Sequence, residues 1–244
     1  MQVIESYICG KENNPNTCED GIFIGKHLLA VIDGVTAKGT RLWNNTKSGH
    51  FAKDVLISTL QKLDACQDEN MLYEDPTVLL TKLDAILHDA VTACAADTLT
   101  LEEYPRASVI IYNNVTKQII SYGDCQGMSL TELAANDLGR AAIQENLMLQ
   151  FSFENKIGEF GYAVLNGMGI EPSLMKVYQV SEGDEIILAS DGYPVLASSL
   201  AESEAILQHV LFEDPMCFRI YHCTKGIKTG NVSFDDRAYC RVSI

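Results

Sequence analysis

The chain has 244 residues, with 18 lysines and arginines against 33 aspartates and glutamates, so its formal net charge at pH 7 is −15. Apolar residues make up 47% of the sequence and charged residues 21%, which is typical of a folded chain and argues against intrinsic disorder. The acidic excess argues against nucleic acid and an anionic membrane as partners, because both are bound through lysine and arginine.

Strands and helices are predicted in groups along the first half of the chain. Short apolar runs at residues 21–24 and 27–32 predict two strands, and the second run stops at Asp33-Gly34. Apolar residues at helical spacing predict a helix between Thr46 and Cys66. A second helix is expected from Pro76 to Cys94, because proline fits the first turn of a helix.

The second half of the chain returns to strands. An Asn113-Asn114 turn between apolar runs predicts a hairpin. The expected strands are 107–112, 118–122, 162–166, 174–180, 184–189 and 237–244, with a helix at 200–211 and an unassigned polar segment at 131–159. Since no linker or repeat interrupts the pattern, we expect residues 1–244 to form a single domain. Strands and helices do not alternate strictly, which favours an α+β fold with antiparallel sheet.

The N-terminal residues, the lengths of the apolar runs and the cysteines together predict a cytoplasmic protein. Residues 1–10 lack a basic region followed by a long apolar stretch, so no secretory signal is expected. No apolar run is long enough to span a membrane. The 8 cysteines are scattered without a Cys-x-x-Cys pair, which favours free thiols in a cytoplasmic protein.

Familiar catalytic patterns are missing from the sequence. We find no Gly-x-Ser-x-Gly elbow, no phosphate-binding loop and no Gly-x-Gly-x-x-Gly. The 5 histidines do not fall in His-x₃-His or His-Glu-x-x-His arrangements, so a zinc site is not expected.

Acidic residues instead lie beside the ends of the expected strands. They are Glu19-Asp20, Asp33, Asp124, Asp191 and Asp235-Asp236. Carboxylates that converge on one rim repel each other unless cations are bound, and oxygen-only clusters suit Mg²⁺ or Mn²⁺. A single Asp-Gly is nevertheless more often a turn than a ligand, so periodicity alone leaves both interpretations open.

The order and spacing of these acidic motifs resemble a known family. The motifs are Cys-Glu-Asp at 18–20, Ala-Val-Ile-Asp-Gly at 30–34, Gly-Asp-Cys at 123–125, Leu-Ala-Ser-Asp-Gly-Tyr at 188–193 and Asp-Asp at 235–236. Together they resemble the metal-dependent type 2C serine/threonine protein phosphatases over roughly residues 13–244. The resemblance implies a central sandwich of two antiparallel β-sheets flanked by helix pairs. It also implies hydrolysis of phosphoserine or phosphothreonine in proteins by a metal-activated water.

Residue roles follow from the same resemblance. Asp33 would bridge two Mg²⁺ or Mn²⁺ ions, with the Gly34 carbonyl on one of them. Asp191 and Asp235 would hold the other ion, and Asp124 with Asp191 could complete a third site. Glu19 and Asp20 would orient metal-bound waters.

The sequence departs from the family at the residue that grips the substrate phosphate. Family members usually have an arginine a few residues before the Glu-Asp pair, whereas this chain has Asn-Asn-Pro-Asn-Thr-Cys. Arg41 is our first candidate for a phosphate-binding residue, and Arg106 or Lys38 are alternatives. The competing interpretation is that Arg41 is a solvated loop charge.

Three functional hypotheses remain open from the sequence. The first is a hydrolase of phosphorylated proteins. The second is a phosphatase-like module that binds a partner with weak or no catalysis, which the missing arginine favours. The third is an enzyme acting on small phosphorylated metabolites.

Overall fold

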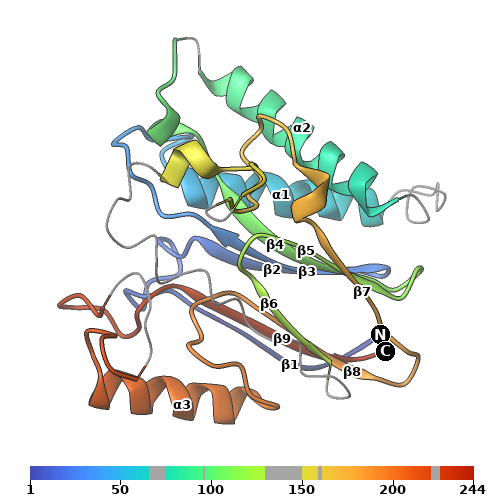
Figure 1. Ribbon diagram of the computed structural model, residues 1–244, viewed down its shortest axis with the longest axis vertical. Helices are drawn as coiled ribbons and strands as arrows, with labels where there is room; N and C mark the ends of the chain where they lie inside the picture. Colours follow the sequence, from blue (N-terminus) through green and yellow to red (C-terminus); the bar gives the residue numbers. More distant parts are fainter. Residues whose placement is uncertain (66–74, 96, 130–149, 159–160, 221–225) are drawn as a thin grey trace.

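A computed structural model describes residues 1–65, 75–95, 97–129, 150–158, 161–220 and 226–244. Within these residues the strands form two antiparallel sheets (Figure 1). The five-stranded sheet has the order β2 (Asp20–Ile24), β3 (Leu28–Gly34), β4 (Ala107–Asn113), β5 (Gln118–Tyr122) and β7 (Lys176–Gln179). The four-stranded sheet has the order β1 (Gln2–Cys9), β9 (Arg237–Ser243), β8 (Glu185–Ala189) and β6 (Gln126–Ser129).

The sheets pack face to face, and β3 shows how the sequence builds both sides of one layer. Its Leu29 and Val31 are buried with Ile186, Leu188 and other residues of the second sheet. Its Leu28, Ala30 and Ile32 alternate with these and pack against the helices. A strand buried on both faces reads as a continuous apolar run, which is why it was predictable.

Helices cover the outer faces of the sandwich (Figure 1). Helices α1 (Ser48–Asp64) and α2 (Pro76–Cys94) pack over the five-stranded sheet, and α3 (Leu200–Glu213) lies on the side of the four-stranded sheet. Short 3₁₀ helices occur at Leu101–Glu103, Gln150–Phe153 and Pro172–Leu174. No helix in the described ranges combines the length and apolar character needed to cross a bilayer.

The predicted sandwich of antiparallel sheets is confirmed, and most predicted elements match the structure within a few residues. Strands β1 and β6 were not predicted. The expected strand at 162–166 is wrong: only isolated bridges occur there, from Tyr162 to Glu154 and from Leu165 to Ala107. Backbone amides of this segment instead donate hydrogen bonds to side chains: the Val164 amide donates to Asn155, and the Asn166 amide donates to Asp84. The polar segment at 131–159 lies largely outside the described residues.

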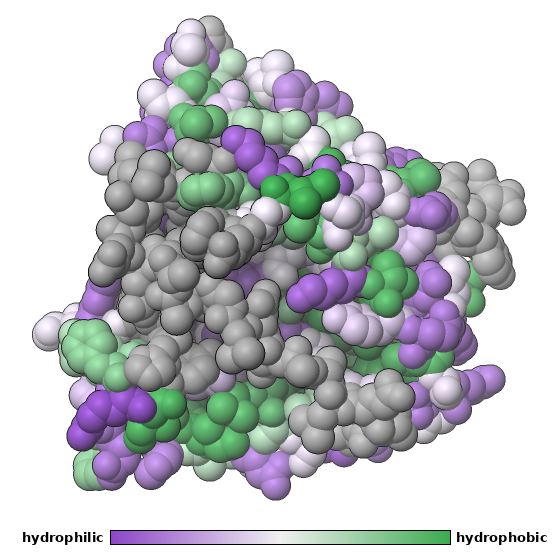
Figure 2. All heavy atoms as spheres, in the orientation of Figure 1, coloured by the Kyte–Doolittle hydropathy of each residue, from purple (hydrophilic) through white to green (hydrophobic). Residues whose placement is uncertain are grey.

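The surface beside α3 is more apolar than its surroundings. Figure 2 shows apolar side chains, in green, at the end of the molecule where α3 lies. Phe212 is 82% exposed and Phe218 is 68% exposed, with Met216 and Ile220 also exposed nearby in the chain. We assign no function to this surface.

Candidate metal centre

Three aspartates meet where strands of both sheets end. Asp33 is the next-to-last residue of β3, Asp191 lies two residues after the end of β8, and Asp124 lies in the turn that carries the chain from β5 to β6. Each can place a carboxylate oxygen within 4.8 Å of the other two. The sequence prediction that these side chains converge on one rim therefore agrees with the geometry.

Strand pairing explains how the five-stranded sheet positions its part of this rim. Asp33 is paired with Asp20 on β2 and with Ser108 on β4. The Ser108 hydroxyl donates a hydrogen bond of 2.6 Å to Asp124. Because backbone register fixes these neighbours, a side chain more than 80 positions further along the chain is held beside Asp33.

Gly34 allows three segments to approach one another behind Asp33. A Cβ atom at this position would lie 2.3 Å from the Gly49 carbonyl oxygen and 2.6 Å from that of Glu19. The Gly34 amide also donates to the Glu19 carbonyl at 3.1 Å. Only glycine fits here, so the Asp-Gly pair serves close packing of the rim rather than a turn.

The electrostatics of the rim are unfavourable without cations. Burial raises the pKa of Asp33 well above its usual range, and the charges of Asp20, Asp191, Asp124 and Asp235 raise it further. Burial likewise raises the pKa of Asp20, and a hydrogen bond from Ser190 offsets only part of that effect. These side chains are therefore costly to ionise together in the absence of a bound cation.

Two buried oxygens on the rim provide an independent sign of a missing ligand. Glu19 is 2% exposed and Asp20 is 4% exposed. Glu19 Oε1 and Asp20 Oδ2 have no hydrogen-bond partner among the described residues. Buried polar atoms normally have partners. An all-oxygen donor set with unpartnered oxygens fits Mg²⁺ or Mn²⁺ together with their waters.

Asp235 and Asp236 occupy different environments although they are adjacent. Asp236 accepts hydrogen bonds from the backbone amides of Lys11 at 2.7 Å and Glu19 at 2.9 Å, so it ties two loops together. Asp235 accepts a hydrogen bond of 2.8 Å from the Lys11 ammonium. Asp235 contributes to the potential at Asp33, but it is outside the compact group of three carboxylates.

The predicted phosphate-binding residues have other partners. Arg41 contacts Asp97 at 2.6 Å and Glu103 at 3.3 Å, and its guanidinium lies 5.6 Å from the centre of the Trp43 ring. Arg106 is buried in an ion pair with Glu154. A phosphate-binding role for Arg41 stays a prediction that its contacts do not support.

Lys11 is the residue at the rim that sequence reasoning missed. Burial lowers its pKa, but Asp235, Asp236 and Glu19 more than offset this, so the pKa is raised above its ordinary value and the ammonium stays charged. It lies eight positions before Glu19, on the N-terminal side of the Asn-Asn-Pro-Asn-Thr-Cys segment at 13–18 where the family has its arginine. The intervening loop folds back through a turn at Asn13, whose φ is 53°. An Asn-Asn-Pro-Asn composition favours such a turn, but no turn was predicted there.

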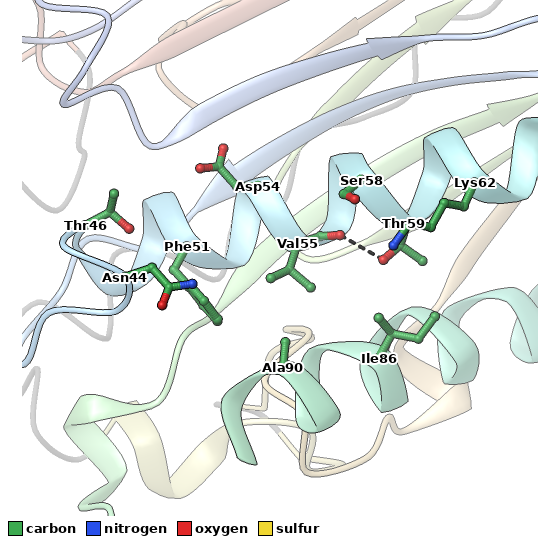
Figure 3. Close-up of a pocket in the computed structure, with 10 residues that line it drawn as sticks. All are labelled: Asn44, Thr46, Phe51, Asp54, Val55, Ser58, Thr59, Lys62, Ile86 and Ala90. Carbon is green, nitrogen blue, oxygen red and sulfur yellow. Dashed lines mark hydrogen bonds between the residues drawn. The ribbon is translucent and has the colours of Figure 1, made fainter. Parts of the chain in front are cut away.

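A separate groove lies between α1 and α2 (Figure 3). It has a volume of about 380 Å³ and is lined by side chains of both helices, among them Phe51, Val55, Ile86 and Ala90. None of the rim carboxylates lines it. We assign no chemistry to it.

Comparison with solved structures places this geometry in a known fold. The catalytic domain of serine threonine protein phosphatase PstP in complex with two manganese ions is 18% identical, covers 97% of this chain and 96% of its own, and has a TM-score of 0.55. The photosystem II phosphatase PBCP is 15% identical, with coverage of 98% and 97% and a TM-score of 0.56. The Mycobacterium tuberculosis serine/threonine phosphatase PstP/Ppp is 18% identical, with coverage of 99% and 98% and a TM-score of 0.54.

The chain has the fold of these phosphatases. The likeness extends over nearly the whole of both chains, which confirms the architecture implied by the resemblance to the type 2C family. No protein-family profile matches the sequence, and no curated protein matches it either. At these identities the shared property is the fold, and the chemistry has to be argued from the rim itself.

Proposed function

We propose that this protein is a Mg²⁺- or Mn²⁺-dependent phosphomonoester hydrolase that dephosphorylates phosphoserine or phosphothreonine in proteins. The observation that carries the proposal is the convergence of Asp33, Asp124 and Asp191 within 4.8 Å on one rim. The phosphatase fold supports it, and PstP, which shares the fold, is described in complex with two manganese ions.

The rim residues divide into ligands and supports. Asp33, Asp191 and Asp124, with the Gly34 carbonyl and Asp235, would hold the ions. When bound, such ions lower the pKa of a coordinated water and offset charge on the phosphoryl oxygens. Glu19 and Asp20 would accept hydrogen bonds from metal-bound waters, because each has a buried oxygen that no described protein group satisfies.

The remaining contacts keep these groups in place. Ser108 fixes one oxygen of Asp124 by its hydrogen bond. Asp236 fixes the backbone on both sides of the 11–19 loop, which orients the Glu19 side chain. Such preorganisation is what hydrolysis without a covalent intermediate requires, since the protein then mainly positions charges.

The proposal extends to the setting of the enzyme. We propose that residues 1–244 act as one catalytic domain, because the rim draws on segments from Glu19 to Asp236. We also propose that it works in the cytoplasm. All six cysteines within the described residues are free thiols, which is consistent with a reducing compartment.

Metal dependence tests the proposal. Purified protein should hydrolyse p-nitrophenyl phosphate and a phosphothreonine peptide only with added Mn²⁺ or Mg²⁺, and should lose this activity in EDTA. Equal rates of hydrolysis with added metal and in metal-free buffer would contradict the proposed mechanism. Faster hydrolysis of the peptide than of small phosphate esters would separate a protein phosphatase from an enzyme of small metabolites.

A phosphatase-like binding module is the second candidate. It is favoured by the engagement of Arg41 and Arg106 with carboxylates, which leaves neither guanidinium free to grip a phosphate. A protein that binds Mn²⁺ tightly and binds a phosphopeptide without turnover would support this alternative.

A further inference from the structure

The ammonium of Lys11 has the surroundings of a bound cation. Its Nζ lies 2.8 Å from Asp235 Oδ1, 3.3 Å from Asp236 Oδ2 and 3.5 Å from Glu19 Oε2. It also donates a hydrogen bond of 3.1 Å to the Thr36 hydroxyl. The contacts with Asp235 and Thr36 are hydrogen bonds, and those with Asp236 and Glu19 are ion pairs.

The backbone of Lys11 is fixed as firmly as its side chain. Its amide donates to Asp236 at 2.7 Å, and its carbonyl accepts from the Val232 amide at 2.8 Å. The side chain is only 16% exposed. The hydrogen bonds of the Lys11 backbone therefore hold its side chain in a position where the ammonium contacts Asp235.

The carboxylates on the two sides of the rim differ in how their charge is balanced. Asp235 and Asp236 have the Lys11 ammonium within 3.3 Å. On the other side, Asp33, Asp124 and Asp191 bring carboxylate oxygens within 4.8 Å of one another, which concentrates negative charge around Asp33. The demand for an added cation is consequently greater at Asp33 than at Asp235.

We propose that Lys11 is a tethered cation that competes with divalent metal for Asp235, so that the rim binds an ion at Asp235 more weakly than an ion at Asp33. This inference rests on the proposed function in assuming that the rim binds divalent metal. Lys11 acts here as a positioning residue that sets metal occupancy. It needs no contact with substrate.

Manganese binding to the full chain tests the inference without an activity assay. Isothermal titration with Mn²⁺, together with electron paramagnetic resonance of free Mn²⁺, should resolve one tight ion and one weaker ion in the wild type. In Lys11→Met and Lys11→Gln the weaker ion should bind about tenfold or more tightly, because a like charge within a few Å changes binding of a cation by at least that factor. The glutamine variant keeps a hydrogen-bond donor beside Asp235. It therefore provides a second test of the inference if the methionine variant does not fold.

Two further variants locate the effect. Lys62→Met removes the same charge from an exposed position on α1 and should leave both affinities within about twofold of the wild type, since exposed charges are screened. Lys11→Met combined with Asp235→Asn should lose the gain seen in Lys11→Met alone, because the second ion then lacks its ligand.

The outcomes separate this inference from the proposed function. Identical isotherms for the wild type and both Lys11 variants would overturn the role of Lys11 while leaving a metal-dependent hydrolase intact. Absence of Mn²⁺ binding in every variant would contradict both proposals. Binding of a second ion that appears only when Lys11 is replaced would support the inference in its strongest form.

Discussion

Buried acidic side chains in the helix layer and on the rim have opposite surroundings. Asp84 on α2 accepts hydrogen bonds from the backbone amides of Asn166, Gly167 and Gly169 at 2.7–2.9 Å. Glu19 and Asp20 on the rim are equally buried, yet each has an oxygen without a partner among the described groups.

The contrast shows how to separate structural from functional carboxylates in one molecule. A buried acid whose oxygens are satisfied by the protein contributes to folding. A buried acid crowded by other acids and left with an open oxygen is costly to the fold, and needs a ligand from outside. Replacing a carboxylate of the first class by a neutral side chain should therefore lower stability and leave turnover unchanged. The same replacement in the second class should lower turnover and leave stability unchanged or improved.

The largest expected effect is on turnover at the rim. Asp33→Asn and Asp191→Asn should each lower hydrolysis by at least about a hundredfold, since charged ligands hold the ions that activate water. Folding should be unchanged or slightly improved, because neutralisation relieves repulsion. Rates at saturating Mn²⁺ and thermal melting followed by circular dichroism measure both effects. Near-wild-type turnover in either variant would show that the assigned site is wrong.

Neutralisation in the helix layer should have the reverse outcome. Asp84→Ala leaves three backbone amides without an acceptor and should lower the free energy of unfolding by about 3 kcal/mol or more. Asp84→Asn keeps one acceptor oxygen and serves as the graded control. Turnover per folded molecule should not change, and urea denaturation checks the stability. A stable Asp84→Ala protein with impaired catalysis would contradict the purely structural role assigned to Asp84.

Dependence on pH sharpens the same contrast. The pKa values of Asp33 and Asp20 are raised by burial and by neighbouring aspartates, whereas unfolded aspartate titrates near about 4. Below that pH both states hold the protons. As pH rises the unfolded chain loses them first, so the stability of the metal-free protein should fall toward neutral pH. Melting temperatures from pH 5 to 8 in EDTA should decline, and added Mn²⁺ should cancel the decline.

The smallest effect is expected at Arg41. Because its guanidinium is paired with Asp97 and Glu103, Arg41→Ala should change KM and kcat by less than about twofold, as is usual for exposed ion pairs. Lys38→Ala, at an exposed basic residue of the same loop region, is the comparison variant. A raised KM with nearly constant kcat in Arg41→Ala alone would instead support a grip on the substrate phosphate.

The central strands and the rim aspartates were predictable because each leaves a local pattern. Strand β3 is an uninterrupted apolar run that stops at Asp33, and its burial on both faces is what the run encodes. Strand β1 escaped prediction because its apolar Val3, Ile4 and Ile8 are exposed, so no buried stripe marks it. Its pairing with β9 is long-range and leaves no local trace.

Lys11 could not be found from local spacing for a related reason. Its position depends on backbone contacts with Asp236 and Val232, which come from the other end of the chain. The incorrect strand at 162–166 reflects the same limit. Its composition suits a strand, but the amides of Val164 and Asn166 go to the side chains of Asn155 and Asp84.

The hydrogen bond from the Glu19 amide to Asp236 joins positions 217 residues apart and has a consequence for synthesis of the protein. A loop of that length closes only after most of the chain exists, and contacts of long sequence separation form late in folding. A nascent chain on the ribosome can build its helices and the β2–β3 hairpin early. It cannot assemble the rim until residue 236 has emerged from the ribosome, because the Glu19 amide has no access to Asp236 before then.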